Sequence, residues 1–268
     1  MRSAFLFVRW QRSRVILDGN TRRRPYDTRS FISDGSNAFT GAAVTEAQIQ
    51  AETAALYSNP ATVNIVFGAN SSLQNGAESL TIPYFQSYSN YVNVLSSNSL
   101  ANPANSTLAT AVANLPNGNG AANPRPVFST PAQLLALGLN VSANIGVDGS
   151  GNLVAGGPFH GAIVIGTTAD TNAVLHEIIE ILGGGGQGSY VASASQNFCL
   201  TSNAHSNCYG VTDLYRYSAP HVASFTTAPN ATAYFSVDGG LTNLANFNQN
   251  GLGDFGDFTT TPCLIQSW

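Results

Sequence analysis

The sequence predicts an α+β fold, in which a small mixed sheet packs on one central helix and a loop-rich C-terminal part follows. Three observations predict it. A helix pattern over 45–60 is followed at once by a strand pattern over 62–69. A buried strand over 161–166 leads into an apolar helix that ends near Gly183. After residue 186 only short β or irregular pieces remain, separated by Gly, Asn and Pro.

The first helix and strand have clear boundaries. Thr45 stands at the start of TEAQIQAETAALYSNP as an N-cap, apolar residues recur at helical spacing, and Asn59-Pro60 ends the helix. TVNIVFGA follows directly and is rich in β-branched residues, as strands are. A helix followed by a strand early in the chain favours the α+β class.

Shorter elements are expected between this strand and the central helix. They are a helix around Tyr88–Leu95, a helix around Leu108–Leu115, a loop over 117–126 and a helix over 129–139. The last has the clearest signal, because Thr130 can cap it and Pro131 suits its first turn. The chain has no internal repeat of a solenoid kind, so we expect residues 31–268 to form a single domain.

Charge is scarce and unevenly placed. Charged residues make up 9 % of the chain, against roughly a quarter in ordinary soluble domains, which suits an exported protein. There is no lysine, and eight of the ten arginines lie between Arg2 and Arg29. From residue 31 onward only Arg125 and Arg216 face twelve acidic residues. No basic stripe is present to neutralise phosphates, so we expect no nucleic-acid partner.

The first thirty residues differ from the rest. The apolar run Ala4–Val8 is too short for a signal-peptide core, and Arg9 interrupts it. We expect residues 1–30 to be disordered or non-native; a transit peptide or a basic arm is the alternative. No run approaches the ~18 apolar residues of a membrane span, so no transmembrane segment is expected.

Three cysteines constrain the compartment and the metal chemistry. Cys199 and Cys208 bracket a short polar loop and would close a disulfide in an oxidising compartment. Cys263 is left over. An odd count without a CxxC pair argues against a cysteine-ligated zinc site.

The central helix, VLHEIIEILGGGG over 174–186, carries an unusual group of ionisable residues. His176 and Glu180 are four residues apart and therefore lie one turn apart on one face, with Glu177 about 100° round from His176. Val, Leu and Ile cover the rest of the circumference, which predicts a buried helix. Asp170 or Thr171 is expected to cap it.

Ionisable groups on a buried helix need a metal, a partner charge or a water-filled cleft, because an unpaired buried charge is prohibitive. A His and a Glu at this spacing can ligate one ion, and Glu177 stands where the general base of HExxH metalloproteases stands. Imidazole and carboxylate both suit Zn²⁺. The structural alternative is a buried His with two Glu satisfied by Arg216 and backbone donors.

The pattern departs from the usual motif in two ways. The second ligand position holds Glu180 rather than His, and Gly186 stands where a longer HExxHxxGxxH motif has its third ligand. Met1 is the only methionine, so a Met-turn is excluded and the chain is no regular metzincin. The third ligand must come from farther along the chain.

Four segments occur together in a recognisable order. LHEIIEILG, TDLYRYSAP, AYFSVDGGLTNLANFN and GDFGDF resemble the motifs of a family of exported bacterial zinc metalloproteases that are zincin-like or metzincin-like. The resemblance covers roughly residues 31–262. It implies a zincin-like fold and zinc as the cofactor. Similar proteins run on past the last motif, so we expect a truncated C-terminus.

The resemblance also implies roles for individual residues. His176 and Glu180 match metal ligands, and Glu177 matches the general base. Asp213 is expected to be a further ligand or a carboxylate beside the ligands. Tyr217, or alternatively Tyr215, is expected to donate to the substrate carbonyl as negative charge develops there.

The expected function is that of a secreted zinc-dependent endopeptidase that hydrolyses protein or peptide substrates through a metal-activated water. We expect it to act as a monomer. The alternative from another class is a non-catalytic exported or surface-binding domain that retains the zincin scaffold.

The remaining candidates have simpler interpretations. His205, inside the cysteine loop, reaches the metal only if that loop folds back, and a surface position is favoured. His160 and His221 are expected to be structural or exposed. Asp254 and Asp257 lie among glycines as in a calcium loop, but the irregular spacing favours a turn.

Overall fold

The protein is described here by a computed structural model. The structure describes residues 5–10, 29–33, 63–69, 73, 76–115, 126–148, 153–185, 209–224, 226, 228–250 and 256–259. Four predictions lie outside them: the helix over 45–60, the loop over 117–126, the pair Cys199–Cys208 with His205, and Asp254.

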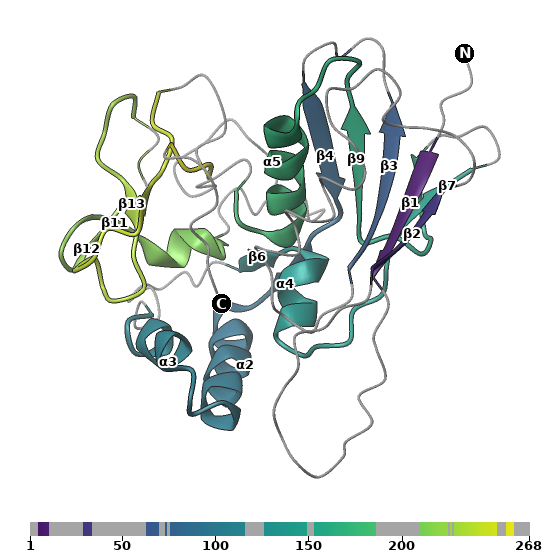
Figure 1. Cartoon of the computed structure of the whole chain (residues 1–268). Helices are drawn as coiled ribbons and strands as arrows, with labels where there is room; N and C mark the ends of the chain where they lie inside the picture. The colour runs from purple at the N-terminus through teal and green to yellow at the C-terminus, as the bar shows by residue number, and fades with distance from the viewer. Residues whose placement is uncertain are drawn as a thin grey trace. The chain divides into compact units, whose positions relative to one another are not determined.

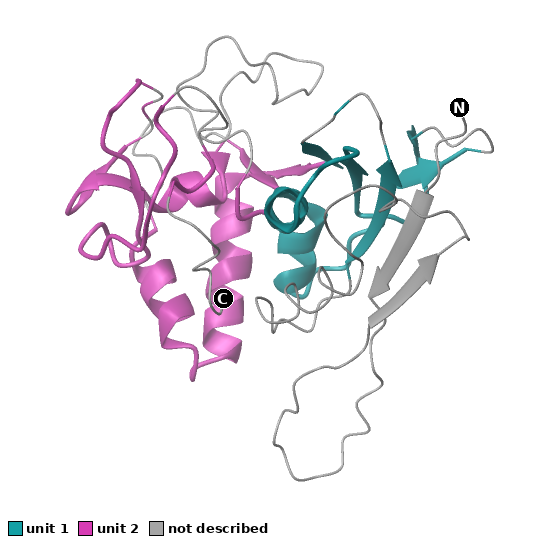
Figure 2. Cartoon of the chain, turned by 45° about the horizontal axis from the view of Figure 1, so that its top comes forward, with its two compact units in different colours: residues 1–82, 130–182, 267 teal, residues 83–129, 183–266, 268 magenta. Residues whose placement is uncertain are grey.

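The chain divides into two compact units whose segments alternate along the sequence. Unit 1 comprises residues 1–82, 130–182 and 267, and unit 2 comprises residues 83–129, 183–266 and 268. Figure 2 draws unit 1 in teal and unit 2 in magenta. Each unit has strands and helices of its own. The single domain expected over 31–268 stays a prediction.

Unit 1 is built on a five-stranded mixed sheet (Figure 1). Its strands, in spatial order, are β2 (Arg29–Ser33), β1 (Phe5–Trp10), β3 (Asn64–Ala69), β9 (Gly161–Ile165) and β4 (Ala77–Thr81). β3 and β9 run parallel, and every other neighbouring pair is antiparallel. The predicted mixed sheet is confirmed, as are the strands predicted over 62–69 and 161–166.

Part of the N-terminal segment is paired in this sheet. Residues 5–10, FLFVRW, pair with β3 in an antiparallel ladder, and residues 29–33 pair with residues 5–10 in turn. Aromatic and β-branched residues favour strands. The expectation that residues 1–30 are disordered or non-native stays a prediction.

Alternate residues of the central strands face two different layers, as the period of two in a strand requires. Ile65 and Phe67 of β3 join a core that contains α5 (Thr171–Leu182) and α4 (Pro131–Ala136). Val66 points to the other face, where it packs with residues around the hairpin of β7 (Ile145–Val147) and β8 (Leu153–Ala155). Both faces of β3 are thus covered, which explains its continuous apolar sequence.

Gly161 sets the distance between β9 and α5. A Cβ added there would lie 2.7 Å from the Cδ1 and Cγ2 atoms of Ile181, closer than such contacts occur. Ile181 is fully buried, so it has no free space to move into. The missing side chain at the start of β9 therefore lets the helix pack directly on the strand.

Among its described residues, unit 2 has two small sheets, two helices and a 3-10 helix. The sheets have the orders β10-β6-β5 and β12-β11-β13-β14. The elements are β5 (Tyr84–Gln86), α2 (Tyr88–Ala101), α3 (Ser106–Ala113), β6 (Val127–Ser129), β10 (Tyr209–Gly210), a 3-10 helix (Thr212–Tyr215), β11 (Arg216–Ala219), β12 (Val222–Ala223), β13 (Tyr234–Phe235) and β14 (Ala245–Asn246). The short elements after residue 186 confirm the predicted loop-rich part.

The helices predicted within the described residues are present, and α4 has the predicted cap. Thr130 and Gln133 form a capping box at the start of α4, with Thr130 N donating to Gln133 Oε1 at 2.9 Å and Gln133 N donating to Thr130 Oγ1 at 3.2 Å. Helices also lie at the two predicted positions before it, although α2 extends to Ala101. No helix among the described residues is long and apolar enough to cross a membrane.

Replacing Gly161 by Ala should lower the free energy of unfolding by about 1–3 kcal/mol, because the added methyl group overpacks against Ile181. Chemical denaturation of both proteins measures the difference. Gly76→Ala is the matched control, since its nearest neighbour would be 3.9 Å away, and it should shift stability by less than about 0.5 kcal/mol. Equal effects of the two substitutions would contradict the close packing of α5 on β9.

Candidate metal centre

Local sequence determines where α5 begins and ends. Asp170 Oδ1 accepts a hydrogen bond from Ala173 N at 2.9 Å, so Asp170 is the cap among the two predicted candidates. Gly183 follows the helix with φ 89°, the left-handed conformation that favours glycine at this position. Val174, Leu175, Ile178 and Ile181 are buried, as the apolar arc predicted.

His176 and Glu180 lie side by side on this helix. His176 Nε2 is 3.4 Å from Glu180 Oε1, and 46 % of the His176 side chain is exposed against 14 % for Glu180. The predicted i, i+4 pair is therefore present in the folded chain. Both atoms are possible metal ligands.

The second carboxylate oxygen of Glu180 has a partner from another element. Ser79, in β4, donates its hydroxyl to Glu180 Oε2 at 2.5 Å. Burial would raise the pKa of Glu180, but the hydrogen bonds from His176 and Ser79 outweigh burial and hold that pKa below its ordinary value. Glu180 is thereby kept ionised, as a metal ligand must be.

Glu177 has the opposite protonation preference. It is 8 % exposed, although the sequence places it in the same polar sector as His176. Burial raises the pKa of Glu177 above its ordinary value, and repulsion from the Glu180 carboxylate raises it further. Two adjacent carboxyl groups whose pKa values move apart are typical of a site where one group carries a proton and the other a charge.

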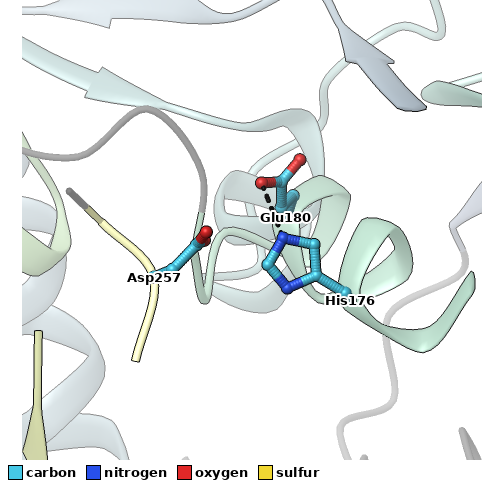
Figure 3. A group of neighbouring side chains, drawn as sticks. All are labelled: His176, Glu180 and Asp257. Carbon is cyan, nitrogen blue, oxygen red and sulfur yellow. Dashed lines mark ion pairs between the residues drawn. The ribbon is translucent and has the colours of Figure 1, made fainter. Parts of the chain in front are cut away.

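His176 and Glu180, both in unit 1, form a pair that could ligate a metal ion (Figure 3). An imidazole nitrogen and a carboxylate oxygen are donors that Zn²⁺ accepts, and three protein ligands are typical of catalytic zinc sites. The pair would therefore need at least one further ligand.

Within unit 2, Asp257 has a well-defined backbone position. Asn248 N donates to the Asp257 carbonyl oxygen at 2.7 Å, and Phe258 forms an antiparallel bridge with Phe247. The rings of Phe247 and Phe258 lie 5.0 Å apart, and both pack against Phe235. The irregular glycine spacing around Asp257 favoured a turn over a calcium loop.

Asp213 has a different environment. It is 2 % exposed, and its Oδ2 accepts a hydrogen bond from Gly210 N at 2.8 Å. Its negative charge raises the pKa of the buried Arg216, although burial lowers that pKa more and brings it to about 10. The Asp213 carboxylate thus accepts a backbone hydrogen bond at the start of the 3-10 helix and offsets the buried charge of Arg216. Its role as a metal ligand remains a prediction.

The two tyrosines expected near the substrate are buried in unit 2. Tyr217 is 6 % exposed, and its hydroxyl donates to the Asn114 carbonyl oxygen at 3.3 Å. Tyr215 is 2 % exposed. Burial raises the pKa of both hydroxyl groups, so both stay protonated and able to donate. The catalytic role assigned to Tyr217 remains a prediction.

The other described histidines fit structural or exposed positions. His160 is 7 % exposed, and its Nδ1 accepts a hydrogen bond from Asn64 N at 2.9 Å, which requires a neutral ring. Burial lowers the pKa of His160 and favours the same neutral form. His221 is exposed in a turn with φ 60°. His160 thus joins β3 to the start of β9.

Comparisons with family models, with curated proteins and with solved structures find no match. The function proposed below therefore rests on the side chains around α5. The resemblance of the four sequence motifs to exported bacterial zinc metalloproteases stays a prediction.

Substitution of Glu180 and of Asp213 distinguishes their roles. Glu180→Gln should weaken zinc binding by more than about 100-fold, because side chains that only support a ligand already contribute roughly 10–100-fold. Asp213→Asn should leave zinc affinity unchanged and lower the free energy of unfolding by about 1–3 kcal/mol, since a buried charged acceptor is lost. Competition with a chelator measures the first effect and denaturation the second. Loss of zinc binding in Asp213→Asn alone would return the ligand role to Asp213.

Proposed function

We propose that the chain is a secreted zinc-dependent endopeptidase with a zincin-like site, in which His176, Glu180 and at least one further oxygen or nitrogen ligand hold the ion. One observation carries the proposal: an imidazole nitrogen and an ionised carboxylate converge at 3.4 Å on a buried helix, directly beside a second carboxyl group of raised pKa. A purely structural ion pair would not need that third ionisable group in an apolar helix.

Zinc bound there would lower the pKa of a bound water to ~7 and so supply a nucleophile at neutral pH. Glu177 would accept the proton of the attacking water and deliver it to the leaving amine. A raised pKa suits this work, because an efficient general base has a pKa near the operating pH. Replacing a neutral histidine ligand with Glu180 reduces the positive charge of the site, so we expect modest activity.

A peptide substrate fits the strand that borders the site. In the part of the sheet that the structure describes, β4 is the edge strand, and its Ser79 hydroxyl contacts Glu180. The outer edge of such a strand offers backbone donors and acceptors to an extended peptide. The scissile bond of a peptide paired there would run beside the metal ligands. We expect the protein to act on it as a monomer.

The second candidate is a non-catalytic exported or surface-binding domain that keeps the same scaffold. One observation favours it: Glu177 is 8 % exposed and its raised pKa keeps it protonated. A base that is shielded from solvent and already holds its proton cannot deprotonate water until a ligand changes its environment.

The two candidates differ in the effect of Glu177→Gln on the cleavage of casein. For an endopeptidase, cleavage should fall by about 10²–10⁴-fold while the zinc content measured by elemental analysis stays stoichiometric, because the base is removed and the ligands remain. Glu78→Gln, at an exposed position of β4, is the control and should cleave like wild type. Absence of zinc after gentle purification, or equal cleavage by Glu177→Gln, would contradict the peptidase.

A further inference from the structure

Ser79 faces α5 because of its register in the sheet. It lies in the middle of β4, directly opposite Ile163 of β9, and directly opposed residues share one face. Ile163 belongs to the core cluster that contains α5, and Ala77, two residues before Ser79, packs against the same cluster. Glu78 and Leu80 alternate with them and are exposed. Ser79 is therefore the polar position on the helix-facing side at the centre of this strand.

The Ser79 hydroxyl and the His176 ring take different oxygens of one carboxylate. Ser79 Oγ is 2.5 Å from Glu180 Oε2, and His176 Nε2 is 3.4 Å from Glu180 Oε1. A carboxylate that accepts a hydrogen bond at one oxygen keeps a defined rotamer and presents the other oxygen in a fixed direction. In Glu180 this second oxygen is Oε1, which lies beside His176 Nε2.

We infer that Ser79 is a positioning residue for the metal centre: its hydroxyl fixes Glu180 so that Oε1 alone faces the ion. The inference rests on the proposed function for the presence of the ion. Hydrogen-bonded partners of ligating carboxylates orient the ligand and contribute strongly to metal affinity. Ser79 would thus orient Glu180 through a hydrogen bond, as a carboxylate or carbonyl often orients a ligating histidine.

Substitutions at Ser79 test the inference on the full chain, with zinc affinity measured by chelator competition. Ser79→Ala should weaken zinc binding by about 10–100-fold. Ser79→Thr and Ser79→Val form a matched pair, because Thr and Val have the same shape and differ in the hydroxyl. We expect Ser79→Thr to bind zinc within about threefold of wild type and Ser79→Val to bind as weakly as Ser79→Ala.

Thr81→Val is the control from the same strand. The Thr81 hydroxyl donates to the His160 carbonyl oxygen at 3.1 Å and not to Glu180, so its removal should leave zinc affinity unchanged. A merely structural role for Ser79 would give equal zinc affinity in Ser79→Thr and Ser79→Val, and that result overturns the inference while the peptidase proposal stands. Failure of wild type to bind zinc overturns both.

Discussion

The burial of α5 against the sheet is the constraint on which the other features depend. A helix that packs tightly on β9 carries three ionisable residues in twelve, and a shielded one must find a partner or change its protonation. Glu180 has partners at both carboxylate oxygens, His176 at one and Ser79 at the other. Glu177 changes its protonation, because burial and the neighbouring Glu180 favour the protonated form.

The apolar packing around the helix makes this arrangement rigid. Gly161 lets Ile181 pack against the strand, and the parallel strands β3 and β9 provide apolar residues beneath the helix. Closely packed interiors leave side chains few alternative rotamers. The His176–Glu180 pair lies on a helix held by this packing.

Unit 2 also contains a buried charged side chain. Arg216 is 1 % exposed, and its guanidinium lies 4.0 Å from the centre of the Phe247 ring. The ring face and the Asp213 charge offset the loss of water around the guanidinium. The same Phe247 pairs with Phe258, the residue after Asp257. The packing that accommodates the buried arginine therefore also fixes the backbone around Phe258.

The sequence by itself determined the features that depend on local spacing. The caps at Thr130 and Asp170, the left-handed Gly183 and the shared face of His176 and Glu180 all follow from residues within one or two turns. Tertiary structure decided which distant groups meet them. Ser79 is 101 residues away from Glu180, and strand register alone brings it under the helix. The burial of Glu177 and the partners of Asp213 likewise follow from packing between segments far apart in the chain, which no local pattern records.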